Sequence, residues 1–212
     1  MDTLSHGLWA TALGKGINVT AKKRLRLGWM ALWGIFPDLF SFIPVILWML
    51  WQIFYGGVDF GEIPRPETLS PEQRSSYSIF RVTQYLYNSS HSLIIFFLCF
   101  LLILIFRLYS STYKQRKAPS VYNPARSTAI MPCWEMSGWA IHILTDIPTH
   151  SRTFYPTLFL WPLSDWCYDG VSWGNMRFMI INYTSLLMVF VFLRLVQRLK
   201  SKHDSRKNRD KK

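Results

Sequence analysis

Long apolar runs separated by polar segments dominate this chain of 212 residues. Residues 92–109 and 179–196 consist mainly of Leu, Ile, Phe, Val and Met. Runs of about 18 such residues indicate helices that cross a membrane. Residues 28–55 form a third, longer run that Pro37 interrupts, and residues 128–147 form a fourth, more polar one. The pattern predicts an all-α fold, namely a polytopic membrane helical bundle of about four spans.

A short segment of mixed polarity precedes these runs. Residues 2–13 predict a helix that Asp2 or Thr3 caps and that Gly14 ends. At 1.5 Å per residue it is about 18–20 Å long, too short to cross a hydrocarbon core of about 30 Å. This helix therefore either lies at the interface or is inserted, and insertion would carry Asp2 and His6 towards the bilayer midplane.

A long Pro-rich segment, residues 56–90, connects the first two spans. Within it, residues 71–87 predict a short amphipathic helix lying on the outer interface. The second span then begins near His91, with Ser89 or Ser90 as its N-cap. Loops of this length commonly act as lids or binding surfaces.

Basic residues are distributed unevenly, and this changes the meaning of the net charge of +12. Lys and Arg collect in residues 15–26, 107–126 and 194–212, whereas the loops 56–88 and 149–176 are close to neutral. Alternation of this kind follows the positive-inside rule. It predicts a multi-pass membrane protein with both termini in the cytoplasm.

The strongly basic end of the chain is expected to behave differently from the rest. We expect residues 1–199 to form one membrane-embedded domain and residues 200–212 to form a disordered cytoplasmic tail. The charge of the tail suits anionic lipid headgroups. Membrane lipids are therefore the expected partners, and no specific nucleic acid is expected.

Residues 138–151 carry the most distinctive polar pattern. His142, Asp146 and His150 follow one another at intervals of four, so the first two lie on one face of a helix. Pro148 disfavours helix before it and allows His150 to fold back from a turn. Imidazole and carboxylate groups are zinc ligands. The alternative is that a His and an Asp four residues apart only hydrogen-bond each other at a helix end.

Other His and Asp residues reach the same depth if one topology is assumed. Asp38 lies about 15 Å along the first span, near the midplane, where insertion scales give an unpaired Asp a cost of about 2.5–3.5 kcal/mol. His6 and His91 come from the N-terminal helix and from the start of the second span. The alternatives are a protonated Asp38 in a kink and an interfacial His91.

We therefore expect one site for a divalent metal, with zinc as the first candidate. The candidate ligands are His6, His91, His142, Asp146 and His150. Asp38 and Asp2 are the candidates for catalysis, each as a further ligand, as an orienting group or as the general base. Arg152 and Asp165, which follow the cluster on a loop, are the candidates for substrate binding.

Four motifs in this order resemble the membrane-bound metal-dependent hydrolases, a bacterial family of LexA-binding, inner-membrane-associated hydrolases. The motifs are Asp2-Thr3-Leu4-Ser5-His6, Pro37-Asp38, Ser90-His91-Ser92 and His142-x-x-x-Asp146-x-x-x-His150-Ser151. The resemblance extends to about residue 196. It implies an integral inner-membrane protein with metal-dependent hydrolase activity. The motifs also resemble, more distantly, the zinc-dependent phospholipase C proteins, which suggests phosphoester chemistry.

The expected activity is metal-assisted hydrolysis of an amphiphilic substrate, such as a phospholipid or a polyprenyl phosphate. Two other classes of protein remain compatible with the same residues. In a metal or proton transporter, the His and Asp side chains would carry the ion across the membrane. In a non-catalytic membrane scaffold, the basic tail would recruit partners and the His and Asp positions would tolerate Ala.

Overall fold

A computed structural model describes residues 1–21, 24–65, 68–117, 134–153 and 155–209, and these residues form helices and loops with no strand among them. The all-α expectation is confirmed for this part of the chain. The elements in order are α1 (Thr3–Thr20), α2 (Leu27–Phe54), α3 (Pro71–Ser76), α4 (Ser78–Ser90), α5 (Leu93–Lys117), α6 (Ser137–Asp146), the 3-10 helix η2 (Ile147–Thr149) and α7 (Met176–Arg209).

Three of the described helices are long and apolar enough to cross a membrane: Leu27–Phe54, Leu93–Ser110 and Met176–His203. Within the apolar windows of the second and third, only 6% and 11% of the residues are buried inside the protein. Large, contiguous apolar surfaces of this kind are rare on soluble monomers. The exposed faces of α5 and α7 therefore indicate a membrane protein.

The expected count of four spans is not confirmed. The described helix in the fourth apolar run, α6, has ten residues, which is about 15 Å and half the hydrocarbon thickness. Residues 128–133 of that run lie outside the described part of the chain. Helix α6 is surrounded by protein instead, because it packs against α1, α2 and α5.

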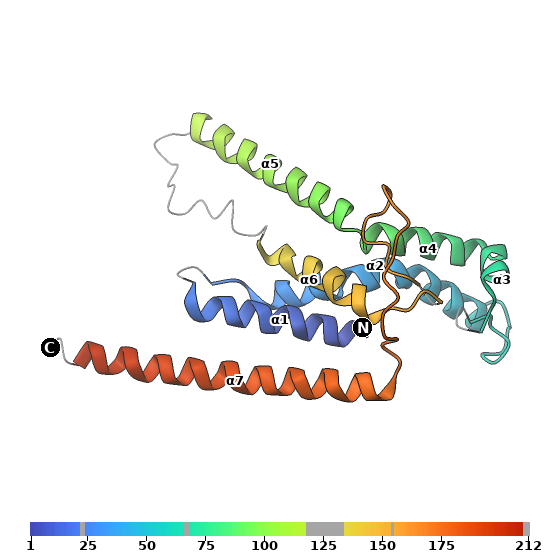
Figure 1. Ribbon diagram of the computed structural model, residues 1–212. Coiled ribbons are helices and arrows are strands. Elements are labelled where there is room, and N and C mark those ends of the chain that lie inside the picture. The colour runs from blue at the N-terminus through green and yellow to red at the C-terminus, as the bar shows by residue number, and fades with distance from the viewer. Residues whose placement is uncertain (22–23, 66–67, 118–133, 154, 210–212) are drawn as a thin grey trace.

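The centre of the molecule is formed by α1, α2 and α6, while α5 and α7 extend along its outside (Figure 1). Helix α7 packs against α1, and two hydrogen bonds join them. Trp9 donates to Asn182 at 2.8 Å, and the Tyr183 hydroxyl donates to Asp2 at 2.8 Å. An apolar core lies where α5 and α6 meet, formed by Phe96, Met136, Trp139 and Ile143.

Two glycines of the central helices permit unusually close backbone contacts. A Cβ atom at Gly34 of α2 would lie 2.7 Å from the Cβ of Ala10 and 2.9 Å from the carbonyl oxygen of His6 in α1. A Cβ atom at Gly138 of α6 would clash with the carbonyl oxygen of Met30 in α2. Only glycine leaves room for such contacts. These residues let the three helices that carry the polar cluster approach one another.

The N-terminal helix is longer than the sequence pattern indicates. Gly14 does not end it, and α1 continues to Thr20. A Cβ atom at position 14 would lie 3.0 Å from Leu27 and 3.1 Å from Met30. Glycine at this position therefore serves packing against α2, which outweighs its low helix propensity.

The start of the second span also differs from the expectation. Ser89 and Ser90 are the last residues of α4 and do not cap α5. The next helix begins at Leu93, where the hydroxyl of Ser92 accepts the N–H of Ile95 at 3.3 Å. His91 therefore lies in the bend between α4 and α5, held by both helices.

Two further segments differ from the sequence pattern. The single amphipathic helix expected for residues 71–87 is divided at Tyr77, whose extended backbone separates α3 from α4. The described part of the basic tail, residues 200–209, is the helical end of α7 and not a disordered segment. Lys and Arg have high helix propensity, so the helix extends beyond its apolar part.

Candidate metal centre

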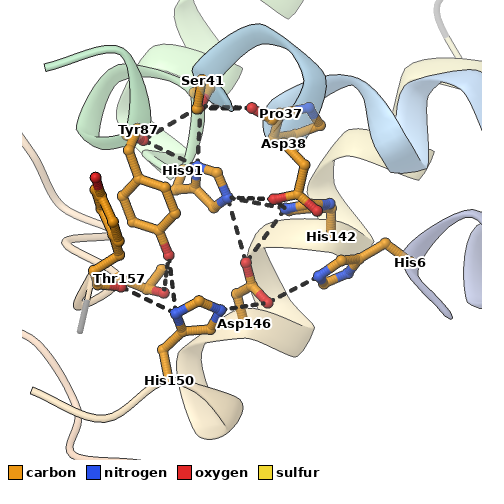
Figure 2. Close-up of polar contacts among 12 residues, drawn as sticks. His6, Pro37, Asp38, Ser41, Tyr87, His91, His142, Asp146, His150 and Thr157 are labelled. Carbon is orange, nitrogen blue, oxygen red and sulfur yellow. Dashed lines mark hydrogen bonds and ion pairs between the residues drawn. The ribbon is translucent and has the colours of Figure 1, made fainter. Parts of the chain in front are cut away.

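Six buried His and Asp side chains from four parts of the chain meet in the centre of the molecule (Figure 2). Helices α1 and α2 contribute one each, the bend after α4 one, and α6 with the segment after η2 the remaining three. Each is 7% exposed or less. They are His6, Asp38, His91, His142, Asp146 and His150.

Two histidines face each other through their Nε2 nitrogens. The Nδ1 of His142 lies 2.6 Å from the carbonyl oxygen of Gly34, and the Nδ1 of His91 lies 3.0 Å from that of Tyr87. A carbonyl only accepts, so each Nδ1 is the protonated donor and each Nε2 of a neutral ring keeps its lone pair. The two Nε2 atoms lie 3.0 Å apart.

Two carboxylates complete this group. Oδ1 of Asp38 lies 3.6 Å from the Nε2 of both His91 and His142, and Oδ2 of Asp146 lies 3.4 and 3.3 Å from the same two nitrogens. One ligand atom from each of the four residues lies within 4.8 Å of the others. Within the described residues, Oδ2 of Asp146 is buried without a hydrogen-bond donor.

The remaining two histidines approach the other oxygen of Asp146. Nε2 of His6 lies 2.9 Å and Nε2 of His150 lies 3.4 Å from Oδ1. The ring of His6 also stacks on that of His142, with centroids 3.6 Å apart. The α-amino group of Met1 contacts Oδ1 of Asp146 as well. Asp146 thus lies between two pairs of imidazoles, as Figure 2 shows.

Neighbouring groups outside the predicted site residues hold these side chains in place. The Thr3 hydroxyl donates to Oδ2 of Asp38 at 2.7 Å. The ring of Tyr87 stacks on His91 with centroids 3.8 Å apart. The contribution of the Gly34 carbonyl cannot be recognised in the sequence, since every residue has a backbone carbonyl group. Thr3 belongs to the N-terminal motif and is the one neighbour that this motif includes.

These residues fit a divalent cation. Two carboxylates supply two negative charges, and two imidazoles supply lone pairs directed at the same small space. Each imidazole also has the second hydrogen bond, to a carbonyl, that fixes the ring of a metal ligand. Buried charges of this kind are costly unless they are paired or coordinate a metal. A group formed by Asp38, His91, His142 and Asp146 could therefore bind a metal ion.

Five candidate residues lie outside this group of four. Asp2 is the N-cap of α1, where its carboxylate accepts the N–H of Ser5 at 3.0 Å. Arg152 is exposed and lines a cavity behind the cluster. Asp165 is exposed on the loop before α7. His6 and His150 lie against Asp146 but outside the group of four.

No family model, no curated protein and no solved structure matches this chain. The geometry of the buried cluster is therefore the basis on which a function is proposed.

Proposed function

We propose that this protein is a membrane-embedded, metal-dependent hydrolase that cleaves a phosphoester bond of a lipid-like substrate. The observation that carries the proposal is the 3.0 Å separation of the Nε2 atoms of His91 and His142, beside an Asp146 oxygen with no donor among the described residues. Two lone pairs that face each other at this distance repel unless a proton or a metal ion lies between them. Two nearby carboxylates favour a cation with more than one charge.

The spacing of the four ligand atoms supports zinc as the first candidate. A tetrahedral ion with bonds of about 2.0–2.1 Å keeps its ligand atoms about 3.3–3.4 Å apart. Five of the six distances among these atoms, namely those that involve His91 or His142, run from 3.0 to 3.6 Å and bracket that value. The two carboxylate oxygens lie within 4.8 Å of each other. Asp38 is thus better suited to hold the metal than to act apart from it as a base.

If a divalent ion held by these four residues took a water as a fifth ligand, it would polarise a phosphoryl oxygen and lower the pKa of that water to about 7. The protein's own groups then orient the reactants and move protons. Thr3 holds one oxygen of Asp38 so that the other faces the two histidines. His150 donates its Nδ1–H to the carbonyl of Tyr155 at 3.0 Å. Its Nε2, which lies 3.4 Å from the α-amino group of Met1, is then the nitrogen that would accept a proton from an attacking water.

The position of the site supports an amphiphilic substrate. Asp38 lies inside α2, a helix long enough to cross a membrane, and every member of the group is buried among helices. A water-soluble substrate would have to cross apolar surface to reach this depth. A lipid-like molecule reaches it from the side and carries its own apolar part into the bilayer.

The experiment is metal analysis of the full chain purified in detergent, with zinc supplied. Asp146→Asn and His142→Ala should each lose most of the bound zinc, because three remaining ligands no longer close the site. His203→Ala, which removes an exposed histidine near the end of α7, is the matched control. Equal loss in the control and in the site variants would contradict the proposed metal site.

Hydrolysis is measured on the same preparations with p-nitrophenyl phosphate and bis(p-nitrophenyl) phosphate. The wild type should release p-nitrophenol from at least one ester, and Asp146→Asn should not. Zinc binding without hydrolysis of either ester, combined with zinc uptake into proteoliposomes, would contradict hydrolysis and favour a metal transporter.

A further inference from the structure

A cavity of about 470 Å³ lies where α3 and α4 meet the loop that follows His150. Three of its lining residues are arginines, one from each of these three segments. Arginine and apolar side chains therefore line the same cavity. The lining residues that matter here are Arg74, Arg81, Arg152, Phe80 and Tyr155.

The charge of this cavity is of one sign. None of the described residues that line it is a carboxylate. Two acidic side chains close to these arginines in the structure lie outside the lining: Glu72 accepts the hydroxyl of Ser70 at 2.8 Å, and Asp169 accepts the backbone N–H of Arg152 at 3.0 Å. Guanidinium groups bind phosphate with paired, charge-assisted hydrogen bonds. The three arginines thus favour an anion of the phosphate class.

The floor of the cavity is apolar. Phe80 and Tyr155 are 3% and 2% exposed, whereas Arg81 and Arg152 are exposed at the surface. A ligand that fills this space would place its anionic group between the arginines and its apolar part on the aromatic rings. This combination is typical of a site for an amphiphile and not for a free inorganic ion.

Tyr155 lines the cavity and also contacts residues that lie beside the metal centre. Its carbonyl oxygen accepts the Nδ1–H of His150 at 3.0 Å, and its ring packs on Tyr87 with centroids 5.3 Å apart. Tyr87 in turn stacks on His91. The backbone of Tyr155 has φ of 44°, in the left-handed region that residues other than glycine seldom adopt. Such strain is frequent at ligand sites.

We propose that this arginine cavity binds the phosphate headgroup of the lipid substrate before the phosphoester reaches the metal centre. The inference rests on the proposed function and names the substrate class as an anionic phospholipid. Arg81 and Arg152 are positioning residues for this headgroup. They lie on different segments, so a single phosphate between them would bring α4 and the loop together.

The test is isothermal titration calorimetry of the full chain in dodecyl maltoside with a chelator present, so that the result does not depend on the metal. The probes are dihexanoyl phosphatidic acid, dihexanoyl phosphatidylcholine and inorganic phosphate. The wild type should bind phosphatidic acid more tightly than the other two. The double variant Arg81→Gln, Arg152→Gln should bind it roughly tenfold or more weakly, as expected for loss of charge-assisted hydrogen bonds.

Two further variants distinguish loss of the binding site from a general charge effect and from loss of folding. Arg177→Gln removes an exposed arginine at the start of α7, outside the cavity, and should bind like the wild type. The double variant Arg81→Lys, Arg152→Lys keeps the charge and should recover part of the affinity, which loss of folding would not allow. Equal weakening by Arg177→Gln, or inorganic phosphate binding as tightly as phosphatidic acid, would overturn the proposal.

Failure of this inference and failure of the proposed function are distinguishable. His142→Ala should bind phosphatidic acid like the wild type, because the cavity does not include the metal ligands. Zinc binding and hydrolysis without affinity for phosphatidic acid would remove the cavity from substrate binding. Affinity for phosphatidic acid in a protein that binds no zinc would leave the cavity as a lipid site and remove the hydrolase.

Discussion

At the scale of single residues, the cluster depends on hydrogen bonds that fix the orientation of each ring and carboxylate. His91 and His142 use one nitrogen for a backbone carbonyl and direct the other at the same space. Thr3 does the equivalent for Asp38. Outer hydrogen bonds of this kind typically alter metal affinity by about 10- to 100-fold when they are removed.

Thr3→Val should therefore weaken zinc affinity by about tenfold while leaving the fold intact, because valine keeps the shape of threonine but cannot donate to Asp38. Competition with a fluorescent zinc chelator measures the change. Thr11→Val is the control, since the Thr11 hydroxyl donates to the carbonyl of Gly7 within α1 and has no contact with the site. Equal affinities for both variants and the wild type would show that Thr3 does not orient a ligand.

At the scale of elements, the site depends on how closely α1, α2 and α6 approach. Gly34 permits contact with α1, and its carbonyl oxygen also accepts the Nδ1–H of His142 in α6. Arg26, the N-cap of α2, joins the start of α6 through two hydrogen bonds of 2.9 Å from its guanidinium to Glu135. One glycine and one ion pair thus connect the helices that supply the ligands.

Gly34→Ala should lower the melting temperature, because the added methyl group would lie 2.7 Å from Ala10 and overpacking costs about 1–3 kcal/mol. It should also reduce zinc binding, since a shift of α2 against α1 would disturb the Gly34 carbonyl that orients His142 and the Thr3 hydroxyl that orients Asp38. Gly28→Ala is the matched control in the same helix, where a Cβ atom meets nothing within 4 Å. If Gly28→Ala lost as much stability, the effect would come from replacing a glycine within α2 and not from the contact between α1 and α2.

The Arg26–Glu135 pair predicts a specific pH dependence. Burial raises the pKa of Glu135, but the hydrogen bonds from Arg26 outweigh this effect and hold the pKa below the usual 4.5. A lowered pKa in the folded state stabilises the protein above pH 4.5, and the contribution disappears as the pH falls through the folded value. Glu135→Gln should lower the melting temperature by a few degrees at pH 7.

The same substitution should have little effect well below pH 4, where the carboxyl of the wild type is itself protonated. Thermal unfolding followed by circular dichroism at both pH values measures the difference. A loss of the same size at both would mean that the ion pair contributes nothing and that the substitution disturbs packing.

At the scale of the whole molecule, apolar surface determines how the protein is placed. Three span-capable helices and the exposed faces of α5 and α7 fit a membrane. We expect the end with α3 and the arginine cavity to face outwards, because the basic segments lie at the opposite end of these helices.

A cysteine at the exposed Ser70, in a chain whose Cys99, Cys133 and Cys167 are replaced, should react with an impermeant maleimide in intact cells. A cysteine at Ser201, near the end of α7, should react only after lysis. The opposite pattern would reverse the expected orientation, and it would place the arginine cavity on the cytoplasmic side.

Local sequence patterns predict only part of the candidate site. The spacing of His142 and Asp146 follows from helix geometry alone, and the structure brings these two side chains to 3.3 Å. The role of Asp2 is harder to predict from the sequence, because an acidic residue before a helix serves equally well as an N-cap or as a metal ligand. Arg74 and Arg81 gave no signal, since arginines in a polar loop segment are ordinary until a cavity brings them together with Arg152.

By itself, the sequence determined that this protein is helical and that it has apolar runs long enough for a membrane, because hydrophobicity and helix periodicity depend on neighbouring residues only. Tertiary structure alone decided that α6 is a short, enclosed helix and that α1 brings His6 against His142. It also decided that the Nε2 atoms of two histidines face each other. These features depend on close contacts between distant segments. Glycines and backbone carbonyl groups make those contacts possible, and neither forms a recognisable functional motif in a sequence.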